Sequence, residues 1–254
     1  MTPGIVTAAL RNTLWSAIIH NVEPDQYENV TFNMWLKFFK LPIDARPTLG
    51  YAVGGRKYEP SWQYVRDQYF AAKWHQVFDY VEYFIHSEVL DEELVNAILE
   101  REAAAYRTID GMICEVTDAG EIATINQALA LEDKFKPVAD HFRTAAERLS
   151  DRINPDYRNS IKESISGVEA MAQIVSGGKA DTLGRLLSRL ERDQNMNGAL
   201  KTGFSSIYGW TSDDKGIRHA MAFPDQQPVN QADAKFFLIA CSAFANYLKT
   251  FDLV

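Results

Sequence analysis

Apolar residues recur three and four positions apart along most of this chain. That period constrains the fold more than any other feature, because it is the spacing of one buried face of an α-helix. The pattern predicts helices over residues 5–19, 34–39, 62–85, 94–99, 122–129, 138–149, 157–175, 182–192 and 234–248. Neither Gly nor Pro interrupts residues 62–85, so we expect one long buried helix there. The sequence therefore predicts an all-α protein.

One short segment departs from the helical period. Residues 107–109 and 112–116 flank the dipeptide Asp110-Gly111. This dipeptide accommodates the two positive φ angles of a tight hairpin turn. We therefore expect one small β-hairpin near residues 107–116 in an otherwise all-α fold.

The charged residues are distributed unevenly. Residues 1–133 contain 10 Lys and Arg against 20 Asp and Glu, a net charge of −10, whereas residues 134–192 contain 11 against 8, a net charge of +3. The charged, proline-bearing stretch 132–137 is the best candidate for a boundary. We expect an acidic helical domain over 1–133 and a second helical domain over 134–254. The basic segment of the second domain either contacts phosphates or is a solvated helix face.

Several classes of protein are excluded by what the sequence lacks. The longest apolar stretches are far shorter than the roughly 20 residues of a membrane span. No leader-like segment precedes Leu10, so we expect a cytoplasmic protein with no membrane partner. Cys114 and Cys241 lack disulfide or zinc spacing and are expected to be buried thiols, and the five histidines are scattered. No phosphate-binding loop or hydrolase motif is found, so we expect no metal and no cofactor.

Polar residues suited to acid–base chemistry gather in one segment, residues 211–220. The guanidinium of Arg218 has the planar fork that holds a phosphate group, and His219 exchanges a proton near neutral pH. Asp213 is close enough in sequence to orient the imidazole. These three residues are the candidate catalytic site, where positioned proton transfer contributes about 10²–10⁴-fold in rate. The alternative is a capped helix start in which Arg218 pairs with Asp213 or Asp214.

A second polar cluster opens the helix predicted over residues 157–175. Arg158 and Lys162 lie one helical turn apart on the same face, and Asn159 lies beside them. These three residues are candidates for binding substrate phosphates. The alternative is that the two cations are i,i+4 partners of nearby acids.

Several ordered motifs resemble a known family. Residues 10–15 (LRNTLW), 34–39 (MWLKFF), 74–82 (WHQVFDYVE), 96–102 (NAILERE) and 106–107 (YR) resemble, in order, the fourth AbiJ amino-terminal domain family of bacterial abortive-infection proteins. This resemblance covers residues 10–130. The rest of the chain, through residues 157–165, 209–214 and 216–220, looks like the helical domain that commonly follows it, which is similar to the HEPN superfamily. The resemblance thus implies a HEPN-like helical bundle over 134–254.

The resemblance also implies a phage-defence role. HEPN proteins often act as metal-independent endoribonucleases that dimerise to form a shared active site, which implies an RNA-cleaving toxin that is a homodimer and needs no cofactor. Their usual signature is Arg followed some residues later by His, whereas here His219 directly follows Arg218. In such a site Arg218 binds the scissile phosphate and His219 acts as general base or acid on the 2′-hydroxyl. Asp213 orients the imidazole.

The sequence is consistent with two other functions. One is a non-catalytic sensor or scaffold of a defence system, which binds nucleotide, RNA or protein through a face with Arg158, Lys162 and Arg218. It predicts binding that weakens with salt and no turnover. The other is a self-inhibited module, in which the acidic residues 1–133 cover the basic segment until a phage-derived trigger separates them.

Overall fold

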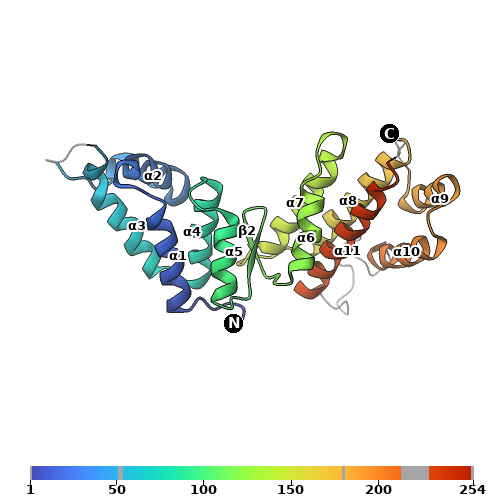
Figure 1. Ribbon diagram of the computed structural model, residues 1–254, viewed down its shortest axis with the longest axis horizontal. Helices are drawn as coiled ribbons and strands as arrows, with labels where there is room; N and C mark the ends of the chain where they lie inside the picture. Colours follow the sequence, from blue (N-terminus) through green and yellow to red (C-terminus); the bar gives the residue numbers. More distant parts are fainter. Residues whose placement is uncertain (1, 51–53, 179–180, 213–228, 253–254) are drawn as a thin grey trace. The chain divides into compact units, whose positions relative to one another are not determined.

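Figure 1 shows the computed structural model, which describes residues 2–50, 54–178, 181–212 and 229–252. The chain divides into two compact units, Met1–Glu115 (unit 1) and Val116–Val254 (unit 2). The elements of the described ranges are α-helices, short 3₁₀ and π-helical turns, and one antiparallel pair of strands. The predicted all-α fold with one small hairpin is confirmed. The domain boundary predicted between residues 133 and 134 stays a prediction.

Unit 1 is built from helices around the hairpin. Its α-helices and strands are α1 (Ala8–His20), α2 (Tyr27–Asn33), α3 (Glu59–Ala71), α4 (Trp74–His86), α5 (Glu92–Arg101), β1 (Arg107–Ile109) and β2 (Met112–Cys114). A π-helical turn, η2 (Met34–Phe39), continues α2 directly. The connections contain the 3₁₀ turns η1 (Pro24–Gln26), η3 (Ile43–Ala45) and η4 (Gly54–Tyr58).

Aromatic rings dominate the core of unit 1. Trp62 of α3 stacks on Trp15 of α1, with 5.6 Å between ring centroids, and on Tyr27 of α2, with 5.1 Å. Tyr69 lies beside Trp15 at 5.1 Å. Aromatic pairs of this kind contribute about 0.5–1.5 kcal/mol each beyond the apolar area that they bury. These rings therefore join α1, α2 and α3 into one core.

The single helix predicted over residues 62–85 is wrong, because the chain forms two helices, α3 and α4. Ala72, which ends α3, is extended, with ψ of 146°. Arg11 of α1 stabilises this helix end. Its guanidinium donates to three carbonyl oxygens at the end of α3, those of Tyr69 (2.7 Å), Phe70 (3.3 Å) and Ala72 (2.9 Å). A side chain from another helix thus satisfies acceptors that are left open where a helix ends.

We expect Arg11→Ala to lower the free energy of unfolding by about 2–3 kcal/mol. Hydrogen bonds to a charged group contribute about 1.5–3 kcal/mol, and the truncation leaves carbonyl oxygens without their donor. Urea unfolding of the full chain followed by circular dichroism measures the loss. The control is Arg66→Ala on α3, whose side chain is half exposed and lies 3.9 Å from Asp67. Equal stability of the two variants would contradict this account of the α3 end.

The β-hairpin predicted near residues 107–116 is confirmed. Its two strands pair antiparallel, with Ile109 opposite Met112. Asp110 and Gly111 form the turn with φ of 52° and 78°. Those are the two positive φ angles that the Asp-Gly dipeptide favours.

Unit 2 is a bundle of helices. They are α6 (Ala119–Leu129), α7 (Lys136–Ser150), α8 (Tyr157–Val175), α9 (Leu183–Gln194), α10 (Gly198–Ser212) and α11 (Gln231–Lys249), with a 3₁₀ turn, η5 (Asp133–Phe135), before α7. The helix α8 packs against α7 and α11, and α6 packs against α11 and α7 (Figure 1). Gly177 and Gly178, with φ of 95° and 76°, follow the end of α8, where the sequence predicts it.

The helices α7 and α8 approach closely because α8 presents small residues to α7. Gly167 lies against the ring of Phe142, and a Cβ atom added there would be 2.9 Å from the ring carbon Cζ. The hydroxyl of Ser160 donates to the carbonyl oxygen of Ala145 at 2.8 Å. These contacts fix the register of α7 against α8, and that register positions the polar side chains described below.

The described residues carry neither a membrane span nor a cluster of metal ligands. None of the helices in the described ranges combines the length and apolar character needed to cross a bilayer. The same ranges contain no group of three or more His, Cys, Asp or Glu side chains placed to hold a metal ion. Cys114 and Cys241 are buried thiols, as predicted, and burial raises the pKa of Cys241.

Candidate functional site

The three predicted catalytic residues, Asp213, Arg218 and His219, lie outside the described residues, so their roles stay predictions. The second predicted cluster does lie in the described part, at the start of α8. There α7 and α8 together present polar side chains that we call the α7–α8 face. It consists of His141, Arg158, Asn159, Lys162 and Glu163.

Asn159 is bound within the start of α8. The carboxylate of Asp156, the N-cap residue, accepts from the Asn159 backbone N–H (3.1 Å) and from its side-chain Nδ2 (2.6 Å). The side-chain hydrogen bond from Asn159 is the main cause that lowers the pKa of Asp156, with smaller contributions from Arg148 and Arg158. Since the folded-state pKa lies below the unfolded value, this stabilisation is present at neutral pH and is lost as the pH falls through the folded-state pKa. One side-chain N–H donor of Asn159 is therefore used in a hydrogen bond to the N-cap carboxylate of α8.

Arg158 and Lys162 differ in their surroundings. Arg158 is half-buried, and its positive charge acts on Asp156. Lys162 is exposed, and no carboxylate of the described ranges lies within ion-pair distance of its ammonium group. Its neighbour Glu163 is directed to a histidine instead. Lys162 therefore keeps its charge available to an anionic ligand.

His141 and Glu163 form a histidine–carboxylate pair across the two helices. His141 Nδ1 lies 2.7 Å from Glu163 Oε2, and the two side chains are 38% and 23% exposed. A carboxylate at Nδ1 fixes the imidazole tautomer and orientation, which leaves Nε2 to exchange a proton. Asn159 lies one helical turn before Glu163 on the same face of α8. The α7–α8 face thus combines an oriented imidazole with an exposed cation.

Sequence reasoning did not find the His141–Glu163 pair. The two residues are 22 positions apart on different helices, so neither the helical period nor a short motif connects them. The register of the two helices, which sets Ala145 opposite Ser160, is known only from the structure. Counting outward from that contact on both helices places His141 near Glu163.

Comparison with known proteins places the chain in a family. The family model named AbiJ N-terminal domain 4 matches residues 2–131. The chain belongs to the AbiJ N-terminal domain 4 family. AbiJ domains occur in abortive-infection proteins, so membership indicates a phage-defence role for this AbiJ protein. The chain matches no curated protein and no solved structure.

The motifs that carry the AbiJ resemblance hold unit 1 together. Asn96 of α5 and Glu82 of α4 accept hydrogen bonds from backbone N–H groups of β1 and β2, at 2.8 and 2.7 Å. Tyr106 stacks on Trp74, with ring centroids 6.1 Å apart. Each of these residues belongs to one of the AbiJ-like segments. The family pattern is therefore explained, at these positions, by packing and hairpin attachment.

Proposed function

We propose that this AbiJ protein is a phage-defence toxin of the bacterial cytoplasm that cleaves RNA without a metal ion. It acts as a homodimer with a HEPN-like site, and a phage-derived component triggers it. The family supports the defence role. The observation that carries the RNA-directed part is the α7–α8 face, where exposed Lys162 adjoins an oriented histidine–carboxylate pair. This face lies in the segment with a net charge of +3, which supports local contact with phosphates.

The proposed reaction uses a nucleophile that the RNA itself supplies. His219 takes the proton from a ribose 2′-hydroxyl, whose oxygen attacks the adjacent phosphorus. The bond from phosphorus to the 5′-oxygen breaks, that oxygen receives the proton that His219 took up, and the products are a 2′,3′-cyclic phosphate and a 5′-hydroxyl, with the imidazole returned to its starting state. Arg218 binds the phosphate oxygens and Asp213 orients the imidazole. Arg158, Asn159 and Lys162 bind flanking nucleotides.

An RNA-cleavage assay in the presence of a chelator tests the proposal. We expect cleavage by the full chain and a loss of about 10²–10⁴-fold in His219→Ala, because that change removes the proton-transferring group. Arg218→Ala should lose activity similarly, and light scattering should give the mass of a dimer. The matched control is His20→Ala at the exposed end of α1. Full cleavage by both Arg218→Ala and His219→Ala would refute the site assignment.

A non-catalytic sensor or scaffold is the second candidate. It is favoured by the hydrogen bonds from Asn159 to the N-cap carboxylate of Asp156, since a side chain that supports a helix cap needs no substrate. This candidate predicts RNA or nucleotide binding that weakens with salt and no cleavage. Lys162→Ala should then reduce binding and lower the salt slope by about 1, as loss of one phosphate contact does.

A further inference from the structure

Unit 2 exposes an apolar surface where α10 lies beside α11 (Figure 1). Trp210 of α10 is 48% exposed, and Phe236 of α11 is 53% exposed. Ile239 and Ala243 follow Phe236 at intervals of three and four residues, so they continue the same face of α11, and Ala243 is also exposed. We call these four residues the α10–α11 strip. The strip shares no residue with the α7–α8 face.

One buried ring holds both exposed rings in place. Phe237 is buried, and Trp210 stacks on it with 5.1 Å between ring centroids and 24° between ring planes. Phe236 meets the same ring edge-on at 5.5 Å. Trp210 and Phe236 are therefore neighbours on the surface. Aromatic side chains that are ordered before binding lose little conformational entropy when a partner covers them, and Trp is among the residues most enriched at interface hot spots.

The core of unit 2 uses a different face of α11. Leu238, Cys241 and Ala245 are among the buried residues of this helix, whereas Phe236 and Ala243 lie outside the buried set. An exposed Phe contributes little burial energy to folding, and Phe is a poorer helix former than Ala. Single exposed apolar residues are ordinary, but adjoining ones mark a surface that contacts another molecule. The strip therefore indicates an interaction surface.

The charges around the strip favour a second copy of this chain as the partner. Its four residues are uncharged, and the charged side chains beside its start are already engaged. Asp233 accepts a hydrogen bond in the cap of α11, and Lys235 pairs with Glu121 of α6 at 2.8 Å. Residues 116–254 contain 16 Lys and Arg against 18 Asp and Glu, a net charge of only −2. A highly charged partner finds no complementary charge here, whereas two near-neutral copies meet without strong repulsion.

We propose that two copies of this chain pair through the α10–α11 strip. Around a twofold axis the same strip serves both copies, so the rings of Trp210 and Phe236 in one copy pack on the strip of the other. Ala243 lies two helical turns after Phe236, and its small side chain leaves room for a ring of the partner. This inference names the surface of the homodimer in the proposed function and rests on that part of it.

Analytical ultracentrifugation of the full chain and of Phe236→Glu tests the proposal. We expect the parent protein to be a dimer. The variant should raise the dissociation constant at least about 100-fold, because each dimer carries the change twice and one interface hot spot accounts for about 30-fold or more. The matched control is Ile153→Glu between α7 and α8, which places the same charge at a 65% exposed residue outside the strip. This control should dimerise as the parent does, and circular dichroism should show that both variants fold.

Trp210 provides a spectroscopic readout of the surface. It is the exposed one of the five tryptophans, since Trp15, Trp35 and Trp62 are buried and Trp74 is half-buried. As the protein concentration rises and the copies pair, its emission should move to shorter wavelength, because the indole leaves water. Trp210→Phe should still dimerise but lack this shift. An emission maximum that stays constant while the parent dimerises would contradict the burial of Trp210 between the copies.

The possible outcomes separate this inference from the rest of the proposed function. A dimer of parental affinity in Phe236→Glu would reject the strip and leave the homodimer on another surface. A parent protein that is monomeric at submillimolar concentration would reject the homodimer and the strip together, whatever the RNA-cleavage assay gives. A monomeric parent whose Trp210 emission responds to added RNA would assign the strip to nucleic acid and reject the second copy.

Discussion

Trp62→Ala is expected to lower the free energy of unfolding by about 3–5 kcal/mol, which is the usual cost of truncating a buried Trp. The indole is 8% exposed and stacks on both Trp15 and Tyr27. Its removal leaves a cavity where α1, α2 and α3 meet. Because a folded domain is stable by only about 5–15 kcal/mol, unit 1 should unfold at much lower urea concentration. Hydrogen exchange measured by mass spectrometry should show the loss of protection across α1 to α3.

The control for this substitution is Trp210→Ala in α10. Trp210 is 48% exposed and stacks on one ring, that of Phe237, at 5.1 Å. We expect it to cost about 1 kcal/mol, in line with a single aromatic pair. If both Trp substitutions cost the same, the stacked rings at Trp62 do not form the centre of unit 1.

Gly167→Val is expected to destabilise unit 2 by about 3 kcal/mol, at the upper end of the cost of overpacking. A Cβ atom at this position would be 2.9, 3.0 and 3.2 Å from three carbons of the Phe142 ring. Phe142 is fully buried, so its ring cannot turn outward into solvent. The helices α7 and α8 must then separate, and urea unfolding should show a lower midpoint.

A double-mutant cycle tests whether the Phe142 ring is the cause. Phe142→Ala alone should cost about 3–5 kcal/mol, and the double variant should be more stable than the sum of the two changes predicts. Gly184→Val on α9 is the control, because nothing lies within 4 Å of a Cβ atom there. Additive effects in the cycle, or equal losses at Gly184 and Gly167, would count against the close α7–α8 contact.

The elements that were predictable from the sequence are those whose signal is local. The Asp110-Gly111 turn needs two positive φ angles, and few dipeptides supply them, so the hairpin followed from two residues. The leucines of α9 repeat at the helical period, and Leu183, Leu186, Leu187 and Leu190 are all buried. A local pattern was sufficient in both cases because the physical cause was also local.

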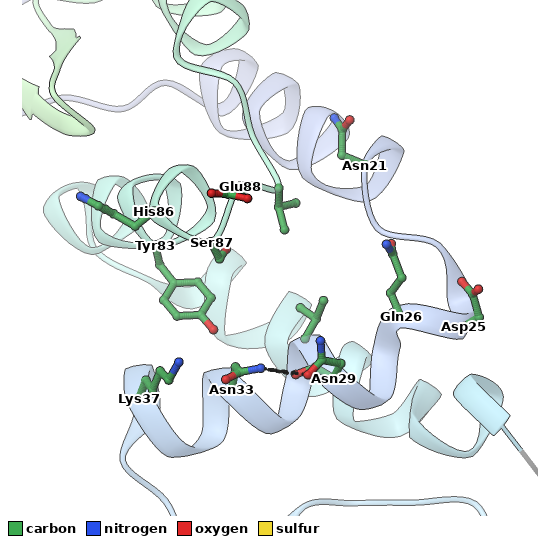
Figure 2. Close-up of a pocket in the computed structure, with 12 residues that line it drawn as sticks. Asn21, Asp25, Gln26, Asn29, Asn33, Lys37, Tyr83, His86, Ser87 and Glu88 are labelled. Carbon is green, nitrogen blue, oxygen red and sulfur yellow. Dashed lines mark hydrogen bonds between the residues drawn. The ribbon is translucent and has the colours of Figure 1, made fainter.

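The features that the sequence did not predict have causes that lie far away along the chain. The break between α3 and α4 is stabilised by Arg11, which is 58 residues before the first carbonyl oxygen that it binds. The His141–Glu163 pair joins two helices. A polar cavity of unit 1, between α2 and the end of α4 (Figure 2), gathers residues from three segments, since Asn21, Asn33 and Tyr83 come from the ends of different helices. No hydrophobic period or short motif predicts such contacts between side chains of different helices, because they form only when the helices pack.

The packing of α6 determines which truncated fragments of this protein do not self-associate. The family match extends to residue 131 and so includes α6, whereas α6 buries Ile125 and Leu129 in unit 2, where it packs against α7 and α11. A recombinant fragment that ends at residue 131 would contain α6 without α7 and α11, so the apolar face of α6 would be exposed to water. Such a fragment should self-associate. A fragment that ends at Glu115, before α6 begins, lacks this exposed apolar surface. It is therefore the better choice for isolating the amino-terminal half.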